Sequence, residues 1–188
     1  MSVPYIKTKR LYLTLPDPHR AADVADYFIR NRAHLHATMP TRPPAYYTTS
    51  YWADRLDEHL QDFRDDRNVN FMVFDRRTDA VVGTCFFSQI LRGPYQGCFL
   101  GYSMDGEREG QGLMTEAVRA ALKWAFETLD LHKINAGHLP DNHGSAKVLA
   151  KLGFEGYGVA PGELLLHGKW EDHVQTRLLN PDWQGRFE

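Results

Sequence analysis

The sequence predicts a mixed α/β domain with a central, mostly antiparallel twisted sheet of about seven strands and four helices. The chain has 188 residues, of which 43% are hydrophobic and 24% charged, values typical of one globular domain over the whole of 1–188. Three runs between 71 and 104 are apolar or alternate in polarity, as strands do. By contrast, 114–129 repeats its apolar residues at helical spacing.

The first 65 residues are expected to form a strand, two helices and a loop between the helices. Alternating leucines predict a strand over 8–15 with one buried face. An Asp-Pro pair, a typical helix start, opens a helical pattern over 17–32. A second amphipathic helix is predicted over 52–63. Three prolines and two tyrosines within 39–49 predict an irregular loop, a candidate lid over a substrate.

The rest of the chain is expected to supply six strands and two helices. An antiparallel meander is predicted from strands at 71–74, 80–90 and 98–104. The clearest helix of the chain follows over 114–129, because its apolar residues fit one face without a miss. A strand over 132–138, a helix over 145–152 and two strands around a turn at Gly168 complete the prediction.

Charge and hydropathy exclude several classes of partner. Twenty-two Lys and Arg against 24 Asp and Glu give a net charge of -2, so direct binding to nucleic acid is not expected. No stretch reaches the roughly 20 apolar residues that a membrane helix needs. The N-terminal basic residues are followed by no apolar run, which argues against export. We therefore expect a soluble cytoplasmic protein, a monomer or a homodimer.

The cysteines and histidines predict neither a disulfide framework nor a metal site. Cys85 and Cys98 are too few for a framework and lack C-x-x-C spacing. We expect them to be reduced core residues, with a cross-link across a hairpin as the alternative. The pair His34-x-His36 lacks the spacing and the carboxylate partner of a zinc motif, so no metal is predicted.

The segment 101–117 carries the pattern most indicative of chemistry. An apolar strand leads to a turn, and Gly-Gln-Gly at 110–112 then opens the clearest helix. Glycines there let backbone N–H groups converge on an anion, and the helix dipole favours negative charge, which predicts a pyrophosphate cradle. The alternative is a tight strand-to-helix turn without a ligand. Thr115 replaces the third glycine of a dinucleotide fingerprint, and the Lys-Ser/Thr of a nucleoside-triphosphate loop is absent.

Several motifs, in order, resemble the GNAT N-acetyltransferases. They are the loop at 110–114 after an apolar strand, Asn142-x-x-Ser145 at the start of the next helix and 151–155 at its end. The segments 8–13, 100–103 and 168–173 resemble the RimJ/RimL branch, which acetylates N-termini of ribosomal proteins, and the likeness is closer to RimJ. The resemblance implies the GNAT fold, with acetyl-CoA as co-substrate in a V-shaped opening between strands four and five.

The resemblance also implies which residues hold the cofactor. Backbone groups of the splayed strand would bind the pantetheine arm, and the glycine loop would bind the diphosphate. The expected cofactor-binding residues are Tyr102, Ser103, Met104, Arg108, Glu109, Gly110, Gln111, Gly112, Leu113, Met114, Asn142 and Ser145. The chain departs from the family at Glu107, where Gln, Arg or Lys is usual. A carboxylate there would repel pyrophosphate, and we expect the neighbouring Arg108 to supply the missing positive charge.

Three residues are candidates for the chemistry. Glu163 stands among glycine and leucines on a late strand, where apolar neighbours would raise its pKa, and it is the favoured general base. Its alternative is an outward-facing strand carboxylate. By its match to the family's helix-opening serine, Ser145 is expected to protonate or orient the CoA sulfur, with an ordinary helix-start hydroxyl as the alternative. The strand at Tyr102 is expected to polarise the thioester oxygen.

The acceptor is expected to be an amine that attacks the thioester directly. An α-amine titrates near ~7.7–8.0 against ~10.4 for lysine, so a protein N-terminus needs only a weak base at cytoplasmic pH. We therefore expect the N-terminus of a ribosomal or other cytosolic protein, framed by the aromatic loop 43–51. The alternatives are a small amine, such as a polyamine, an amino acid or an antibiotic, and a CoA-binding sensor or assembly factor without turnover.

Overall fold

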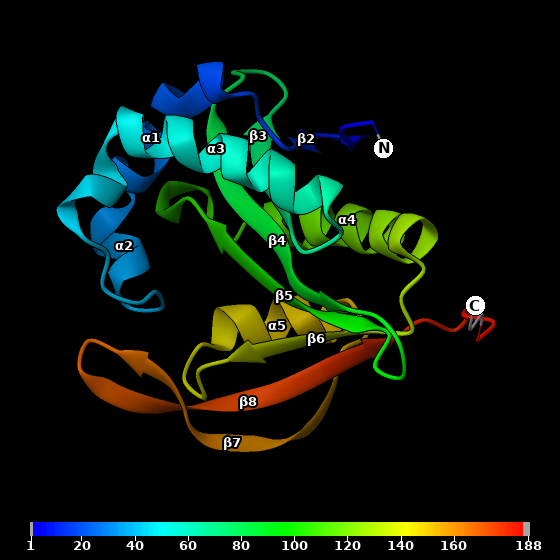
Figure 1. The fold of residues 1–188 in the computed structure, drawn as a ribbon. Coiled ribbons are helices and arrows are strands. Elements are labelled where there is room, and N and C mark those ends of the chain that lie inside the picture. Colours follow the sequence, from blue (N-terminus) through cyan, green and yellow to red (C-terminus); the bar gives the residue numbers. More distant parts are fainter. Residues whose placement is uncertain (1, 186–188) are drawn as a thin grey trace.

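The computed structural model describes residues 2–185, which form one sheet flanked by helices (Figure 1). Its strands are β1 (Tyr5–Lys7), β2 (Leu11–Thr14), β3 (Val69–Asp75), β4 (Val81–Leu91), β5 (Gly97–Met104), β6 (Lys133–His138), β7 (Glu155–Leu166) and β8 (Lys169–Leu179). Its α-helices are α1 (Ala21–Arg30), α2 (Arg32–His36), α3 (Thr49–Arg64), α4 (Leu113–Leu129) and α5 (His143–Lys151). The sheet order is β1-β2-β3-β4-β5-β6-β8-β7, and only β5 and β6 pair in parallel. The predicted mixed α/β fold is confirmed.

The chain begins with a hairpin where the sequence predicts a single strand. The alternating leucines do form a strand with one buried face, since Leu11 and Leu13 of β2 are fully buried. Thr8 precedes them in a turn, where its hydroxyl oxygen accepts the Leu11 N–H over 3.0 Å, and β1 folds back to pair with β2. Side chains that bond the local backbone in this way favour turns. The expected strand 8–15 therefore becomes two strands, and the sheet has eight strands in the described chain instead of about seven.

The helix predicted over 17–32 is interrupted near its end. Asp17 caps its start as expected, because its side chain accepts a backbone N–H. The break between α1 and α2 falls at Asn31. The Asn31 side chain donates to the Tyr27 carbonyl oxygen over 2.9 Å and accepts the Gly106 N–H over 3.0 Å. The break is thus tied to the turn that follows β5. Because it divides one predicted helix into α1 and α2, residues 2–185 contain five α-helices where four were predicted.

The other predicted elements are observed with small shifts at their ends. The helices expected over 52–63, 114–129 and 145–152 are α3, α4 and α5, and the meander is β3, β4 and β5. The strands around Gly168 are β7 and β8. The segment 39–49 is irregular apart from a 3₁₀ turn over Pro44–Tyr47 and the first residue of α3.

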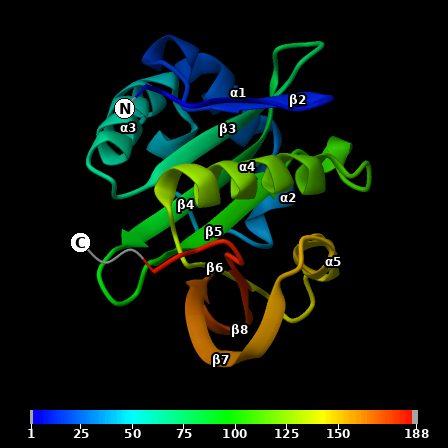
Figure 2. The ribbon, with the colours of Figure 1, turned by 90° about the vertical axis from the view of Figure 1, so that its right-hand side faces the viewer.

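Hydrophobic residues fill both sides of the sheet. On β3, Phe71 and Val73 join the cluster that contains the buried face of α4, whereas Met72 and Phe74 join the cluster that contains α1. Figure 2 shows α4 lying across one face of the sheet, with α1 and α3 behind it. Since both faces of β3 are buried, its central residues Phe71–Phe74 are all apolar and do not alternate with polar ones. None of the helices within residues 2–185 is long and apolar enough to cross a membrane.

The two central strands separate after a short stretch of parallel pairing. β5 and β6 pair only from Gly97 opposite Lys133 to Phe99 opposite Asn135. Beyond Phe99, β5 stays with β4 up to Met104, while β6 stays with β8. The facing edges of the two strands are therefore unpaired and form a V that opens toward α2 and the β7–β8 hairpin (Figure 1). The predicted splay is confirmed. It lies between β5 and β6, which are the fourth and fifth strands of the prediction because β1 and β2 were predicted as one strand.

The cysteines do not face each other across the β4–β5 hairpin. Cys85 stands opposite Tyr102, and Cys98 pairs with Ile134 of β6. The register of β4 and β5 shifts between Ser88 and Leu91, so the near symmetry of the cysteines about the turn is not kept in space. Both thiols are free and buried, and the alternative of a cross-link is wrong for this structure.

Candidate active site

The turn between β5 and α4 presents a row of free backbone N–H groups. Gly110 and Gly112 both have φ of +72°, a left-handed conformation that other residues adopt at a cost. Gly112 caps α4 without a side chain, so the first amides of the helix point out of its N-terminus. From Gly110 to Met114, no backbone N–H donates a hydrogen bond to another described residue. This geometry, with the positive end of the α4 dipole, fits a diphosphate.

The amides just before this row are already engaged and hold the turn in place. Gly106 donates to Asn31, and the Glu107 N–H donates to the Asp105 carboxylate over 3.1 Å. Asp105 is itself buried and forms an ion pair with Arg30 of α1. The turn is therefore fixed to the helix on the opposite side of the sheet, which leaves the glycine loop pre-organised.

Two charged side chains, Glu107 and Arg108, lie just before the glycine loop. Glu107 is exposed, as its polarity favours. The guanidinium of Arg108 does not stand free beside the loop, because its Nη1 lies 3.2 Å from the carboxylate of Asp75 on β3. Arg108 is thus part of an ion pair, and its expected contribution of positive charge to the cofactor site stays a prediction.

A cation that sequence reasoning did not assign lies on the cradle. The Arg10 Nη1 donates to the Gln111 carbonyl oxygen over 2.9 Å, and its Nε donates to Glu116 over 2.7 Å. Its Nη2 lies 3.8 Å from the position that a Cβ of Gly112 would occupy. Arg10 belongs to segment 8–13, which was used above as evidence of the family resemblance. No function was assigned to Arg10 there. In the structure, Arg10 places a guanidinium, paired with Glu116, against the glycine loop.

The same network holds the first turn of α4. The Thr8 hydroxyl and the Arg10 backbone N–H both donate to Glu116 Oε1, over 2.7 and 2.8 Å. Partial burial acts to raise the pKa of Glu116, but hydrogen bonds from Arg10 and Thr8 prevail and lower it below its ordinary value. Glu116 is thus ionised although it lies close to the predicted diphosphate site, and its charge is balanced by the guanidinium of Arg10.

Across the V, the structure brings Tyr102 and Ser145 together. The Tyr102 hydroxyl of β5 lies 2.8 Å from the Ser145 hydroxyl of α5. Burial raises the pKa of Tyr102 to about 12, so this phenol is protonated at neutral pH. Asn142 accepts the Ser145 N–H over 2.9 Å and caps α5, while its contact with the cofactor stays a prediction. The pair is a hydroxyl relay that two different elements position.

The opposite side of β5 carries a second hydroxyl cluster. The Ser103 hydroxyl lies 2.8 Å from the Tyr27 hydroxyl of α1 and 2.7 Å from the Thr84 hydroxyl of β4. Burial raises the pKa of Tyr27 to about 12. Because successive residues of a strand point to opposite faces, Tyr102 and Ser103 place hydroxyl groups on both sides of the V.

Glu163 lies in a different environment from the one predicted. It is exposed on β7, the edge strand of the sheet, where the register shifts between Ala160 and Leu164. Leu164 and Leu165 are themselves 39% and 46% exposed, so the expected apolar surroundings are absent. Glu163 has no hydrogen bond or ion pair with another residue of 2–185. Its role as the base stays a prediction.

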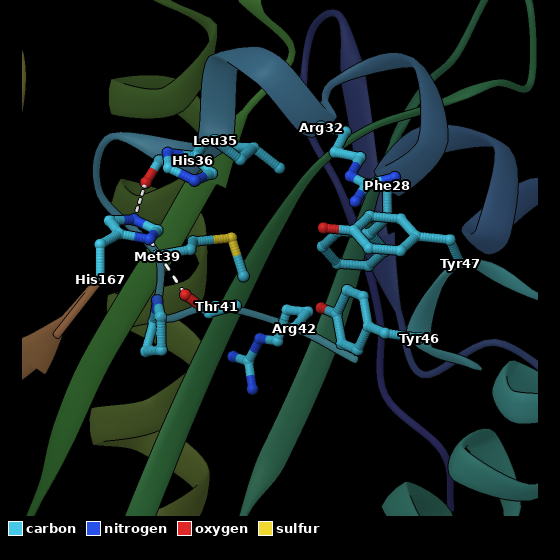
Figure 3. A pocket seen from close by; sticks show the side chains of 11 residues that line it. Phe28, Arg32, Leu35, His36, Met39, Thr41, Arg42, Tyr46, Tyr47 and His167 are labelled. Atoms are coloured by element: carbon cyan, nitrogen blue, oxygen red, sulfur yellow. Dashed lines mark hydrogen bonds between the residues drawn. The ribbon is translucent and has the colours of Figure 1, made fainter. Parts of the chain in front are cut away.

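A cavity of about 110 Å³ lies between the α2 region and the turn of the β7–β8 hairpin (Figure 3). Its lining includes Phe28, Arg32, His36, Arg42, Tyr46 and His167. The His167 ring stacks on His36 with centroids 3.7 Å apart and bonds Thr41 over 3.0 Å. Tyr46 is buried and packs on Phe28. The loop predicted as a lid is thus a packed wall of this cavity.

The remaining reactive side chains do not form a second centre. Within residues 2–185, no group of three His, Cys, Asp or Glu side chains is arranged to hold a metal ion. Burial raises the pKa of Cys98 to about 12 and also raises that of Cys85. Neither thiol is a thiolate nucleophile at neutral pH.

Comparison with known proteins places the chain in a family. The model of the acetyltransferase (GNAT) domain matches residues 10–155. The [Ribosomal protein uS5]-alanine N-acetyltransferase of Escherichia coli is 36% identical over 97% of this chain and 95% of its own. The crystal structure of ribosomal-protein-S5-alanine acetyltransferase from Vibrio fischeri, also 36% identical, superposes with a TM-score of 0.93 over 96% of this chain and 99% of its own.

A third similar structure was solved with a disulfide of the cofactor. Mycobacterium smegmatis RimJ, solved in complex with CoA-disulfide, has a TM-score of 0.85 at 22% identity, over 94% of this chain and 86% of its own. At that identity the likeness concerns the fold, which agrees with the splayed sheet described above. The family match over 10–155 and the free amides of the glycine loop lead to one conclusion. The chain belongs to the GNAT family and is an acetyl-CoA-dependent N-acetyltransferase.

Proposed function

We propose that this enzyme acetylates the N-terminal α-amine of a ribosomal protein in the cytoplasm, with an N-terminal alanine as the preferred first residue. The observation that carries the proposal is the 36% identity to a ribosomal protein uS5-alanine N-acetyltransferase over 97% of this chain. A V that opens on a cavity beside the β7–β8 turn also suits an extended chain end.

The residues present fit the cofactor. The amides from Gly110 to Met114 would hold the diphosphate, with Arg10 beside them, and the unpaired edge of β5 from Tyr102 to Met104 would hold the pantetheine arm. When bound, acetyl-CoA supplies the acetyl group as an activated thioester. The chain's contribution is then to position the amine, to polarise the carbonyl oxygen and to provide a proton for the departing sulfur.

The Tyr102–Ser145 pair is proposed to provide that proton. The amine nitrogen forms a bond to the carbonyl carbon, the carbon–sulfur bond breaks, and the thiolate takes a proton from the hydroxyl relay. In this proposal the Ser145 hydroxyl donates to the sulfur, and Tyr102, held protonated by burial, restores the proton of Ser145. The two hydroxyl oxygens are 2.8 Å apart, which is within hydrogen-bond distance for proton transfer from Tyr102 to Ser145.

Glu163 is proposed to accept the proton that the amine loses. Glu163 is exposed and has no partner among the described residues, which leaves its carboxylate free to accept a proton. An α-amine, partly neutral at pH ~7.7–8.0, needs only a weak base. If Glu163→Gln leaves kcat/KM within about twofold of the parent, bulk water takes the proton and the assignment is wrong.

Two measurements test the acceptor. Mass spectrometry of ribosomal proteins from cells with and without the gene should find one N-terminal acetyl group that depends on the gene. In vitro, release of CoA thiol should be seen with peptides that begin with free alanine. Turnover of polyamines, amino acids or antibiotics with no turnover of any peptide would replace the proposal by a small-amine acetyltransferase. Cofactor binding without turnover of any amine would indicate a sensor.

A further inference from the structure

The cavity beside the β7–β8 turn is positively charged although the whole chain carries a net charge of -2. Arg32 of α2 and Arg42 of the following loop line it together with His36 and His167. No aspartate or glutamate of the described chain lines it. A local excess of cations without a matching acid raises the local concentration of anionic groups.

Neither arginine is engaged by an acid of the described chain. The other arginines around the site are held by Glu116, Asp105 or Asp75. The guanidinium of Arg32 instead lies 4.6 Å from the centroid of the Tyr47 ring, and that of Arg42 lies 5.0 Å from the Tyr46 ring (Figure 3). Stacking on a ring holds a guanidinium plane in place and leaves its N–H donors free for a carboxylate.

The rings that carry these arginines are themselves fixed. Tyr46 is buried, and its ring packs edge-on against Phe28 and Trp52 with centroids 5.0 and 5.1 Å apart. Tyr47 contacts Tyr46 in the same way at 5.4 Å. The aromatic loop thus serves as a rigid platform for two cations, which reduces the entropy lost when an anion binds.

The cavity lies on the acceptor side of the V. Phe28 in its wall follows Tyr27, whose hydroxyl touches Ser103 on the splayed part of β5. The cofactor cradle begins α4, which covers the other face of the sheet. An acceptor whose amine reaches β5 from the α1 side therefore extends its following residues past this cavity.

We propose that Arg32 and Arg42 bind a carboxylate of the acceptor, namely the side chain of an aspartate or glutamate within the first few residues after the acetylated N-terminus. The inference rests on the proposed function and adds a rule of substrate choice to it. Four residues of extended peptide span at most about 14 Å, so we expect the acidic residue among positions two to five. A free amino acid would present the same chemistry through its α-carboxylate.

Peptides that begin with alanine and end in an amide test the proposal. A series with glutamate placed at one of positions two to five is compared with glutamine at the same position, by CoA thiol release. At one position we expect kcat/KM to favour glutamate by about tenfold, which is about 1.4 kcal/mol. Arg32→Gln and Arg42→Gln should each reduce this ratio of glutamate to glutamine kcat/KM severalfold. Arg42→Glu should favour lysine at that position.

Arg64→Gln is the matched control, because Arg64 is an exposed arginine at the end of α3, outside the cavity. It should leave the glutamate preference as in the parent. Acetylation of all peptides without discrimination between glutamate and glutamine would overturn this inference and leave the proposed function standing. Failure to acetylate any peptide would overturn both. Turnover of free amino acids, lost on their amidation, with peptides ignored, would assign the arginines to a small acceptor and overturn the peptide rule.

Discussion

Replacing Gly110 by alanine distinguishes two reasons for a glycine at this position. One is the backbone conformation of the turn, and the other is access of the diphosphate to the backbone amides. Gly110 has φ of +72°, and a Cβ built there meets no atom within 4 Å. The folded protein therefore accepts the methyl group without a clash, and only the backbone conformation is penalised. That penalty is about 1 kcal/mol, which for a chain of this length lowers Tm by about 2–4 °C.

The effect on the cofactor should be larger than the effect on stability. The methyl group would project from a row of amides that donate no hydrogen bond within the described chain. Loss of one hydrogen bond from such an amide to a charged phosphate is worth about 1.5–3 kcal/mol. We therefore expect the KM for acetyl-CoA to rise by one to two orders of magnitude, with kcat at saturation much less affected.

Gly93→Ala provides the matched control. Gly93 has φ of +62°, and its built Cβ also meets nothing within 4 Å, but it lies in the β4–β5 turn at the opposite end of β5 from the cradle. Thermal unfolding should show similar losses for both variants. Thiol-release kinetics at varied acetyl-CoA should show a raised KM for Gly110→Ala alone. Equal cofactor KM values for the two variants would refute the cradle.

Three further results are expected from the same geometry. Arg10→Gln should raise the KM for acetyl-CoA about tenfold, measured by thiol release, because it removes the cation on the loop; an unchanged KM would leave Arg10 a structural role only. Glu116→Gln should lower Tm at pH 7, and the difference should shrink as pH falls below about 4.5, since a depressed pKa stabilises the fold above the ordinary value and is lost on acidification; a pH-independent difference in melting curves would contradict this. Tyr102→Phe and Ser145→Ala should each lower kcat about 100-fold and be far from additive together, because they share one relay; additive losses in the double-mutant cycle would show separate roles.

Much of the fold could be predicted because local patterns coincide with the final environment. The helix of 114–129 repeats one apolar face, and Val118, Ala121 and Ala125 are indeed fully buried. The first hairpin was not predicted. It depends on a hydrogen bond from the Leu11 N–H to the Thr8 hydroxyl, and such a local bond does not change the spacing of hydrophobic residues in the sequence. The break at Asn31 was missed for a related reason, since its partner Gly106 is far away in the sequence.

The candidate site was predicted less completely than the fold. The glycine loop is a local motif, so its place at the start of α4 followed from the sequence. The pairing of Arg108 with Asp75 and the contact of Arg10 with Gln111 join segments that the sheet alone brings together, and no spacing rule predicts them. Glu163 was placed among apolar residues by its neighbours in sequence, but β7 is exposed along almost its whole length, so those neighbours do not bury it.

In the proposed mechanism, the splay of β5 from β6 would let one strand contact both substrates. Tyr102 points toward α5 and Ser103 toward α1, so consecutive residues of β5 touch the cofactor side and the acceptor side. A closed sheet would separate these two sides by a layer of backbone hydrogen bonds. Where the pairing ends after Phe99, a thioester held on one face and an amine held on the other can meet within the sheet. Since both substrates must be bound for this meeting, and since both thiols of the chain are buried, the geometry favours direct attack in a ternary complex over transfer through an acetylated side chain.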